Sequence, residues 1–163
     1  MKKYILIAST NDRYDMLIEC IESINLYAKD WDVIIVSQGY NTKELNYIQR
    51  IISKSSMVLH LDKKIGMHNA KMVGLEYIKS LSSSYVVCSS DDDMVFTSKT
   101  KFDTALNKLS EKDVGFVSLG WVKHKSQLDS YKMVDQFVKQ DIVYTGGGML
   151  FTERLTQILL EES

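Results

Sequence analysis

Short β-rich runs alternate with helical periodicity along most of the chain, and this alternation constrains the fold more than any other feature. The runs predicted as strands are residues 4–9, 32–37, 57–61, 85–90 and 114–119. Apolar residues between them recur at the three- and four-residue spacing of amphipathic helices. Helices are therefore predicted over residues 13–28, 41–52, 67–81 and 98–109. Strand–helix units repeated in this way predict an α/β fold, with a doubly wound, mostly parallel sheet and helices on both faces.

The last third of the chain departs from this alternation. From residue 120 to 141 the sequence is polar with scattered aromatic residues, and a loop or an irregular β segment is predicted there. Residues 142–161 are predicted to form a short strand, a glycine turn, a second short strand and a final helix capped by Thr152. Because 163 residues are enough to bury one hydrophobic core, residues 1–163 are expected to form a single domain.

Charge and cysteine content limit the partners and the compartment. Lys and Arg number 20 against 21 Asp and Glu, and they are scattered, so no nucleic-acid partner is expected. Cys20 and Cys88 are each predicted to be a small buried hydrophobe in a reducing compartment. The apolar run 4–8 is too short for a signal peptide, and no run reaches transmembrane length. These features predict a cytoplasmic protein, with a peripheral position at a membrane left open.

Polar residues follow three of the predicted strands at the point where each strand ends. They are residues 9–11 (Ser-Thr-Asn), 37–39 (Ser-Gln-Gly) and 91–93 (Asp-Asp-Asp). In doubly wound sheets, ligands bind beyond the carboxyl ends of the strands. The three segments are therefore expected to line one crevice.

The three consecutive aspartates indicate a metal site. Neighbouring carboxylates repel one another unless water, a cation or a ligand offsets the repulsion. In extended backbone Asp91 and Asp93 would point to one side and Asp92 to the other. Two carboxylates on one side suit Mg²⁺ or Mn²⁺, which could stabilise charge on a departing diphosphate. Zinc is not expected, because no His or Cys lies at ligand spacing. The alternative is a solvated loop in which one aspartate caps the following helix.

Five segments resemble GT-A glycosyltransferases of the family 2 type. The D-x-D at the end of the fourth strand is similar to their metal-binding signature, and the other matching segments are ILIASTNDR, DVIIVSQG, KKIGMHNAKMVGLEYI and YTGGGMLFTERLTQIL. The resemblance covers essentially the whole chain. It implies a Rossmann-like GT-A domain that binds a nucleotide sugar. The implied activity is a hexosyltransferase that uses Mn²⁺ or Mg²⁺ to move a sugar from a UDP- or GDP-linked donor to an acceptor hydroxyl.

The resemblance also assigns roles to individual residues. Asp91 and Asp93 would bind the metal and are the catalytic residues that the resemblance implies. Asp141 is the third candidate catalytic residue; it is not implied by the resemblance, and Asp135 and His124 are alternatives to it as a general base. The residues implied in donor binding are Ala8, Ser9, Thr10, Arg13, Gln38, Lys71, Asp91, Asp92 and Gly147. Among these, the first three would line the base pocket, and Lys71 would approach the diphosphate or sugar unless it is a surface helix residue.

Some family features are missing from this sequence. Ser37 or Gln38 stands where the family commonly has a base-recognising Asp, and the Glu-Asp pair that usually supplies the catalytic base does not follow. Three explanations stay open: a chain cut short at its C-terminus, a base from another segment or a partner chain, or donor binding without efficient transfer. A homo-oligomer is one way to cover surface that a missing segment would leave exposed.

Two rival functions remain. A nucleotidyltransferase that makes a sugar nucleotide also uses aspartates and Mg²⁺ on a similar sheet, but the stretch STNDRYD lacks the expected glycine-rich loop. A non-catalytic donor-binding module would retain the sheet and the aspartates alone. The sequence does not identify the acceptor.

Overall fold

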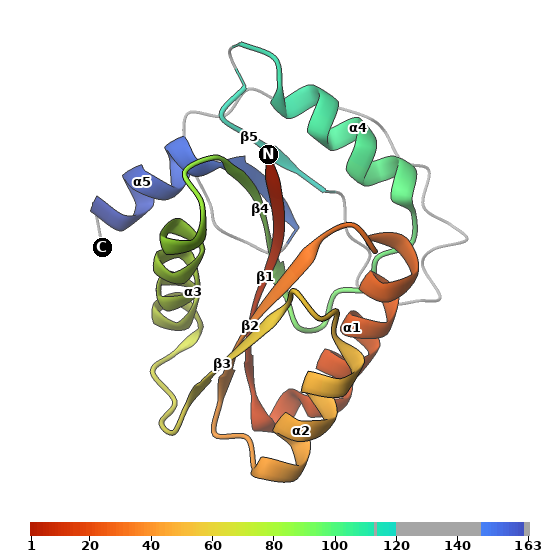
Figure 1. Ribbon diagram of the computed structural model, residues 1–163, viewed down its shortest axis with the longest axis vertical. Helices are drawn as coiled ribbons and strands as arrows, with labels where there is room; N and C mark the ends of the chain where they lie inside the picture. The colour runs from red at the N-terminus through yellow and green to blue at the C-terminus, as the bar shows by residue number, and fades with distance from the viewer. Residues whose placement is uncertain (113, 120–147, 162–163) are drawn as a thin grey trace.

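A six-stranded mixed sheet forms the centre of the molecule (Figure 1). The computed structural model describes residues 1–112, 114–119 and 148–161. Within them the strand order is β3-β2-β1-β4-β6-β5. The strands are β1 (Lys2–Thr10), β2 (Asp32–Gln38), β3 (Met57–Leu61), β4 (Tyr85–Asp91), β5 (Phe116–Ser118) and β6 (Met149–Thr152). The first four are parallel, and β6 is antiparallel to both β4 and β5. The predicted α/β fold with a mostly parallel sheet is confirmed.

Helices lie at the predicted places between the strands and after the last strand. They are η1 (Asn11–Arg13), α1 (Tyr14–Tyr27), α2 (Thr42–Ile51), α3 (Met67–Leu81), α4 (Lys99–Leu109) and α5 (Glu153–Glu161). At the start of α2, the Asn41 side chain accepts from the Glu44 backbone N–H and the Glu44 carboxylate accepts from the Asn41 N–H, which is a capping box. Ser98 occupies the N-cap position of α4, but its side chain makes no capping hydrogen bond.

The sheet is buried on both faces, as its continuous apolar strands require. Helices α1, α2 and α4 cover one face, whereas α3 and α5 cover the other (Figure 1). Successive β1 side chains alternate between the two cores. Ile5 and Ile7 pack with the first group of helices, and Leu6 packs beneath α3 and α5. This packing fixes β1 at the centre of the sheet.

A glycine lets α3 approach the sheet closely. A Cβ atom on Gly74 would lie 2.2 Å from Leu6 Cδ1 and 3.1 Å from Val36 Cγ2. Any larger residue would therefore push α3 away from β1 and β2. Lys71 lies one turn earlier on the same helix, toward the carboxyl ends of the strands.

The sheet differs from the prediction at one edge. The strand expected over 114–119 is shorter, and β6 lies between it and β4. Leu150 and Phe151 of β6 are fully buried, so this inserted strand completes the core. Thr152 ends β6 and directly precedes α5, at the position predicted for its cap, and its carbonyl accepts from Thr156 Oγ1 at 3.3 Å. The structure predicted for residues 120–147 lies outside the described residues.

Candidate functional site

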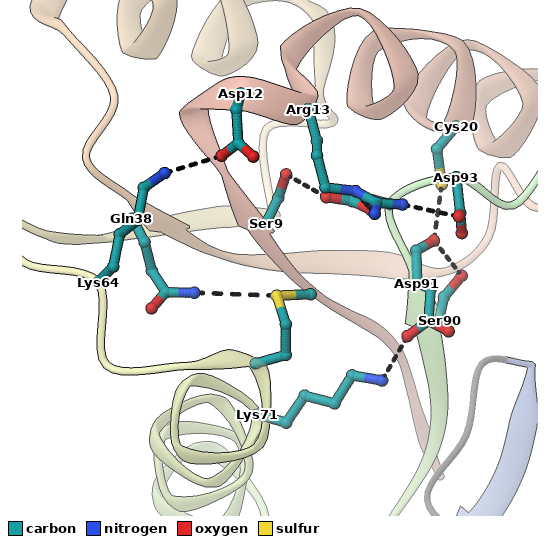
Figure 2. A network of polar contacts seen from close by, with 12 residues as sticks. Ser9, Asp12, Arg13, Cys20, Gln38, Lys64, Lys71, Ser90, Asp91 and Asp93 are labelled. Atoms are coloured by element: carbon teal, nitrogen blue, oxygen red, sulfur yellow. Dashed lines mark hydrogen bonds and ion pairs between the residues drawn. The ribbon is translucent and has the colours of Figure 1, made fainter.

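Three strand ends meet at one edge of the sheet, as the sequence predicts. The register pairs Ala8 with Asp91 across β1 and β4, and Thr10 with Gln38 across β1 and β2. The short helix η1 follows β1 directly and brings Arg13 beside the aspartates (Figure 2). Polar groups from β1, β2 and β4 therefore converge at the position where parallel sheets bind ligands.

The aspartates lie on a turn instead of extended backbone. The Met94 N–H donates to the Asp91 carbonyl at 3.3 Å, so the chain reverses immediately after β4. The alternation expected of a strand does not apply beyond Asp91. As a result, the three carboxylates enter three different environments.

Asp91 pairs with a buried lysine. Lys71 Nζ donates to Asp91 Oδ1 at 2.8 Å, and only 9% of the Lys71 side chain is exposed, against 41% for Asp91 (Figure 2). A buried ammonium group needs an anionic partner to offset its lost hydration. Lys71 is therefore a buried residue of α3 that pairs with the end of β4, and not an exposed surface residue.

Asp92 points into the protein. It accepts hydrogen bonds from Ser9 Oγ at 2.6 Å and from Arg13 Nε at 2.7 Å, and 1% of its side chain is exposed. Burial raises the pKa of Asp92, while the contacts with Ser9 and Arg13 oppose that rise. The Ser9 hydroxyl is also 2.7 Å from the Tyr40 hydroxyl, and burial raises the pKa of Tyr40 to about 12. Asp92 is thus held by fixed polar groups away from the rim.

Asp93 lies at the rim and shares the same arginine. Arg13 Nη2 donates to Asp93 Oδ2 at 2.7 Å, and 53% of the Asp93 side chain is exposed. The carboxylates of Asp91, Asp92 and Asp93 and the two cations, Arg13 and Lys71, together carry one net negative charge. We call these residues the aspartate cluster: Ser9, Arg13, Lys71, Asp91, Asp92 and Asp93.

The donor set of the cluster fits a hard divalent cation. Lys71 uses Oδ1 of Asp91 and Arg13 uses Oδ2 of Asp93, so one oxygen of each carboxylate has no ion-pair partner among the described residues. Mg²⁺ is typically held by one or two carboxylates, with water and phosphate oxygens completing its shell. Across the described ranges, no group of three or more His, Cys, Asp or Glu side chains converges on a metal position. Asp91 and Asp93 together therefore suit a metal that arrives with a phosphate ligand.

At the end of β2, the side-chain amide of Gln38 is held by contacts within the protein. Gln38 is fully buried, its Oε1 accepts from the Ile65 N–H at 2.8 Å, and its Nε2 lies 3.9 Å from Met67 Sδ (Figure 2). These contacts tie the segment between β3 and α3 to the end of β2. Next to Gln38, Gly39 adopts a φ of 72°, which lets the chain turn away from the strand.

The start of β6 contacts the aspartate turn. The Gly148 N–H donates to the Ser89 carbonyl at 2.7 Å, and the Gly148 carbonyl accepts from the Leu119 N–H at 2.6 Å. A Cβ on Gly148, whose φ is 76°, would lie 2.8 Å from Met94 Cε. The predicted site residues Asp141 and Gly147 lie outside the described residues.

A hollow of about 350 Å³ adjoins the cluster at Arg13 and is lined by residues 11–16 and Glu44. Asp12, Asp15 and Glu44 make this lining acidic, which disfavours an anionic diphosphate. Asp12 also pairs with Lys64 at 2.8 Å, and this contact lowers the pKa of Asp12 to about 2. The hollow is therefore distinct in character from the rim of Asp91 and Asp93.

Sequence reasoning did not find Tyr40. Its hydroxyl extends the buried chain from Asp92 through Ser9, and its ring is buried in the core. An aromatic residue directly after the Ser-Gln-Gly at the end of β2 was the available signal. Arg13 was included as a donor-binding residue, but its contact with two aspartates depends on how η1 folds over the turn.

None of the helices within the described ranges combines the length and the apolar character needed to cross a membrane.

Comparisons with known proteins show the family and the fold. The family model "Glycosyl transferase family 2" matches residues 4–160. A similar fold is found in the mannosyltransferase PcManGT from Pyrobaculum calidifontis, which was solved with GDP-Man and Mn²⁺. The two chains are 14% identical, with a TM-score of 0.53, and the match covers 72% of this chain and 34% of PcManGT. The S. aureus TarS 1–349 structure with UDP-GlcNAc gives 15% identity and a TM-score of 0.58, over 72% of this chain and 34% of that one.

At these identities the two structures show a shared fold alone. The chain spans about a third of the length of either solved structure. No curated protein matches its sequence.

Proposed function

The chain belongs to glycosyl transferase family 2, and we propose that it transfers a sugar from a nucleotide-diphospho-sugar to an acceptor hydroxyl with the help of Mn²⁺ or Mg²⁺. The observation that supports this most is the aspartate cluster at the carboxyl edge of the sheet. There, Asp91 and Asp93 offer carboxylate oxygens beside two cations of the chain.

Asp91 and Asp93 would hold the divalent ion. When bound, the ion would act as a Lewis acid that stabilises negative charge on the diphosphate leaving group. Lys71 and Arg13 would add positive charge on the same side as the leaving group, since each already contacts a rim carboxylate. Asp92 would keep Arg13 in place without binding the metal, because its side chain is buried.

The end of β1 would receive the nucleotide base. Thr10 ends the strand and is partly exposed, so it would contact the planar ring, while fully buried Ala8 and Ser9 would support this surface from beneath. Gln38 would shape this surface through its bond to the Ile65 N–H instead of reading the base edge. PcManGT and TarS were solved with a GDP-linked and a UDP-linked sugar respectively, and the donor proposed here carries one of these two nucleotides.

The acceptor side of the reaction is assigned to the segment before β6. Asp141 would take the proton from the acceptor hydroxyl as general base, and the backbone at Gly147 would approach the donor sugar or the acceptor. Both residues precede Gly148, whose N–H is bonded to β4 beside the aspartate turn.

Nucleotide binding tests the proposal. Calorimetric titration of the full chain with UDP and with GDP, each with and without Mn²⁺, should show binding that requires the metal. Asp93→Asn should weaken that binding at least tenfold, since it removes a charged metal ligand. Asp103→Asn is a matched control, because its side chain is also 53% exposed and also pairs with one cation, in this case Lys99. Absence of metal-dependent binding, or equal binding by Asp93→Asn and wild type, would contradict the proposal.

Product analysis separates transfer from the two rival functions. Release of UDP from UDP-GlcNAc, or of GDP from GDP-mannose, would support transfer or donor hydrolysis. A donor-binding module would bind without that release. A nucleotidyltransferase would instead release pyrophosphate from a nucleoside triphosphate and a sugar 1-phosphate.

A further inference from the structure

We propose that Arg13 exchanges partners when the donor binds: it occupies Asp93 in the donor-free protein, gives this carboxylate up to the metal, and then contacts the diphosphate. Buried Asp92 acts as the anchor that keeps Arg13 beside the cluster throughout. The inference rests on the proposed function, because it requires a divalent ion at Asp91 and Asp93.

The guanidinium of Arg13 is divided between two carboxylates. Its Nε donates to Asp92 Oδ1 and its Nη2 donates to Asp93 Oδ2, both at 2.7 Å (Figure 2). A guanidinium can serve two acceptors at once because its donors point in fixed directions. Arg13 therefore links the buried part of the cluster to its rim.

The two contacts differ in strength. Asp92 has 1% of its side chain exposed and also accepts from Ser9, so losing Arg13 would leave a buried carboxylate poorly compensated. Asp93 is 53% exposed, and water can replace Arg13 there at little cost. When a competing cation arrives, the contact with Asp93 is the one that breaks.

A divalent ion that binds Asp93 through both oxygens competes directly with Arg13 for Oδ2, and an ion at the other oxygen still lies close to the guanidinium. The ion and the guanidinium would share a carboxylate and repel each other across a short distance. Arg13 should therefore oppose the binding of metal alone. Once a diphosphate accompanies the metal, the released Nη2 faces a new anion that a guanidinium binds well. Arg13 should then favour the binding of metal with nucleotide.

This reversal of sign distinguishes partner exchange from a purely structural role. If Arg13 only stabilised the turn, its loss would weaken the binding of metal alone and of metal with nucleotide together. If it exchanges partners, its loss strengthens the first and weakens the second.

The experiment compares Arg13→Gln with wild type in two titrations. Binding of Mn²⁺ alone is followed by the electron paramagnetic resonance signal of free Mn²⁺, and binding of UDP and GDP at saturating Mn²⁺ is followed by calorimetry. Arg13→Gln should bind Mn²⁺ roughly three- to tenfold more tightly, because a half-exposed ion pair and a repulsion are removed. It should bind the nucleotide about tenfold more weakly, because a charge-assisted contact is lost.

Two further variants keep the test decisive. The double variant Arg13→Gln with Asp92→Asn avoids an uncompensated buried carboxylate, and it should show the same reversal if the single variant fails to fold. Lys64→Gln removes one positive charge that pairs with Asp12 instead of the cluster, and it should change either affinity by no more than about twofold.

The inference and the proposed function fail in different ways. If wild type binds neither Mn²⁺ nor the nucleotides, the proposed function and this inference are both overturned. If wild type binds both, but the Arg13 variants weaken both or leave Mn²⁺ binding unchanged, partner exchange alone is overturned.

Discussion

The close approach of α3 to the sheet predicts that Gly74→Ala destabilises the fold. The new Cβ would lie 2.2 Å from Leu6 Cδ1, well inside the optimal carbon–carbon separation of about 3.5–4.0 Å. Leu6 is 1% exposed and has little room to withdraw, so the cost should fall near the upper end of the ~1–3 kcal/mol typical of overpacking. Ala has a higher helix propensity than Gly, and this difference offsets about 1 kcal/mol of that cost.

The net loss should therefore be about 2 kcal/mol in the free energy of unfolding, which for a chain of this size lowers Tm by roughly 4–8 °C. Urea denaturation followed by circular dichroism measures the first quantity and a thermal scan the second. Gly115→Ala is the matched control, because its Cβ would meet nothing within 4 Å. A Gly74→Ala protein at least as stable as wild type would refute the reasoning, since it would show that Leu6 or α3 moves without cost.

Three further predictions concern the caps and contacts around the site. Asn41→Ala should lower the free energy of unfolding by about 1 kcal/mol, because it removes the capping box of α2, and urea denaturation against wild type measures this. Lys64→Gln should raise the pKa of Asp12 from about 2 toward its ordinary 3.8, which NMR titration measures. In the wild type, the stability that this lowered pKa contributes is present above pH 3.8 and is lost as the pH falls toward 2. Gln38→Ala should speed hydrogen exchange at the Ile65 N–H and weaken nucleotide binding, because that N–H loses its acceptor; an unchanged exchange rate would refute the tie between β2 and the segment before α3.

The parallel part of the fold was predictable from sequence because its signals are local. Helix α3 shows apolar spacing along its own length, and α2 carries a capping box that two residues specify. The shared edge of the strand ends then followed from the general topology of parallel sheets. The insertion of β6 between β4 and β5 was not predictable, since it depends on pairing between residues such as Cys88 and Leu150 that are distant in sequence.

The site was predictable in its residue types but not in its contacts. The consecutive acids identified the position, while the turn that closes from Met94 to Asp91 replaced the extended geometry assumed for them. Periodicity also cannot show that one guanidinium serves two of the three carboxylates, because η1 must first fold over the turn. The hydrogen bond from the Ile65 N–H to Gln38 also could not be predicted from the local sequence pattern, because it joins residues from different segments.

The hydrogen bonds at Gly148 have a consequence for how such a chain can diversify. Leu119 and Gly148 are joined by a backbone hydrogen bond, and Gly148 is joined in turn to Ser89, so the two residues that flank the stretch 120–147 are held next to each other and to β4. The entropic cost of closing a flexible loop rises by only about 0.6 kcal/mol for each doubling of its length. Evolution or an engineer could therefore exchange this stretch for a longer or shorter one while the strands beneath keep their alignment.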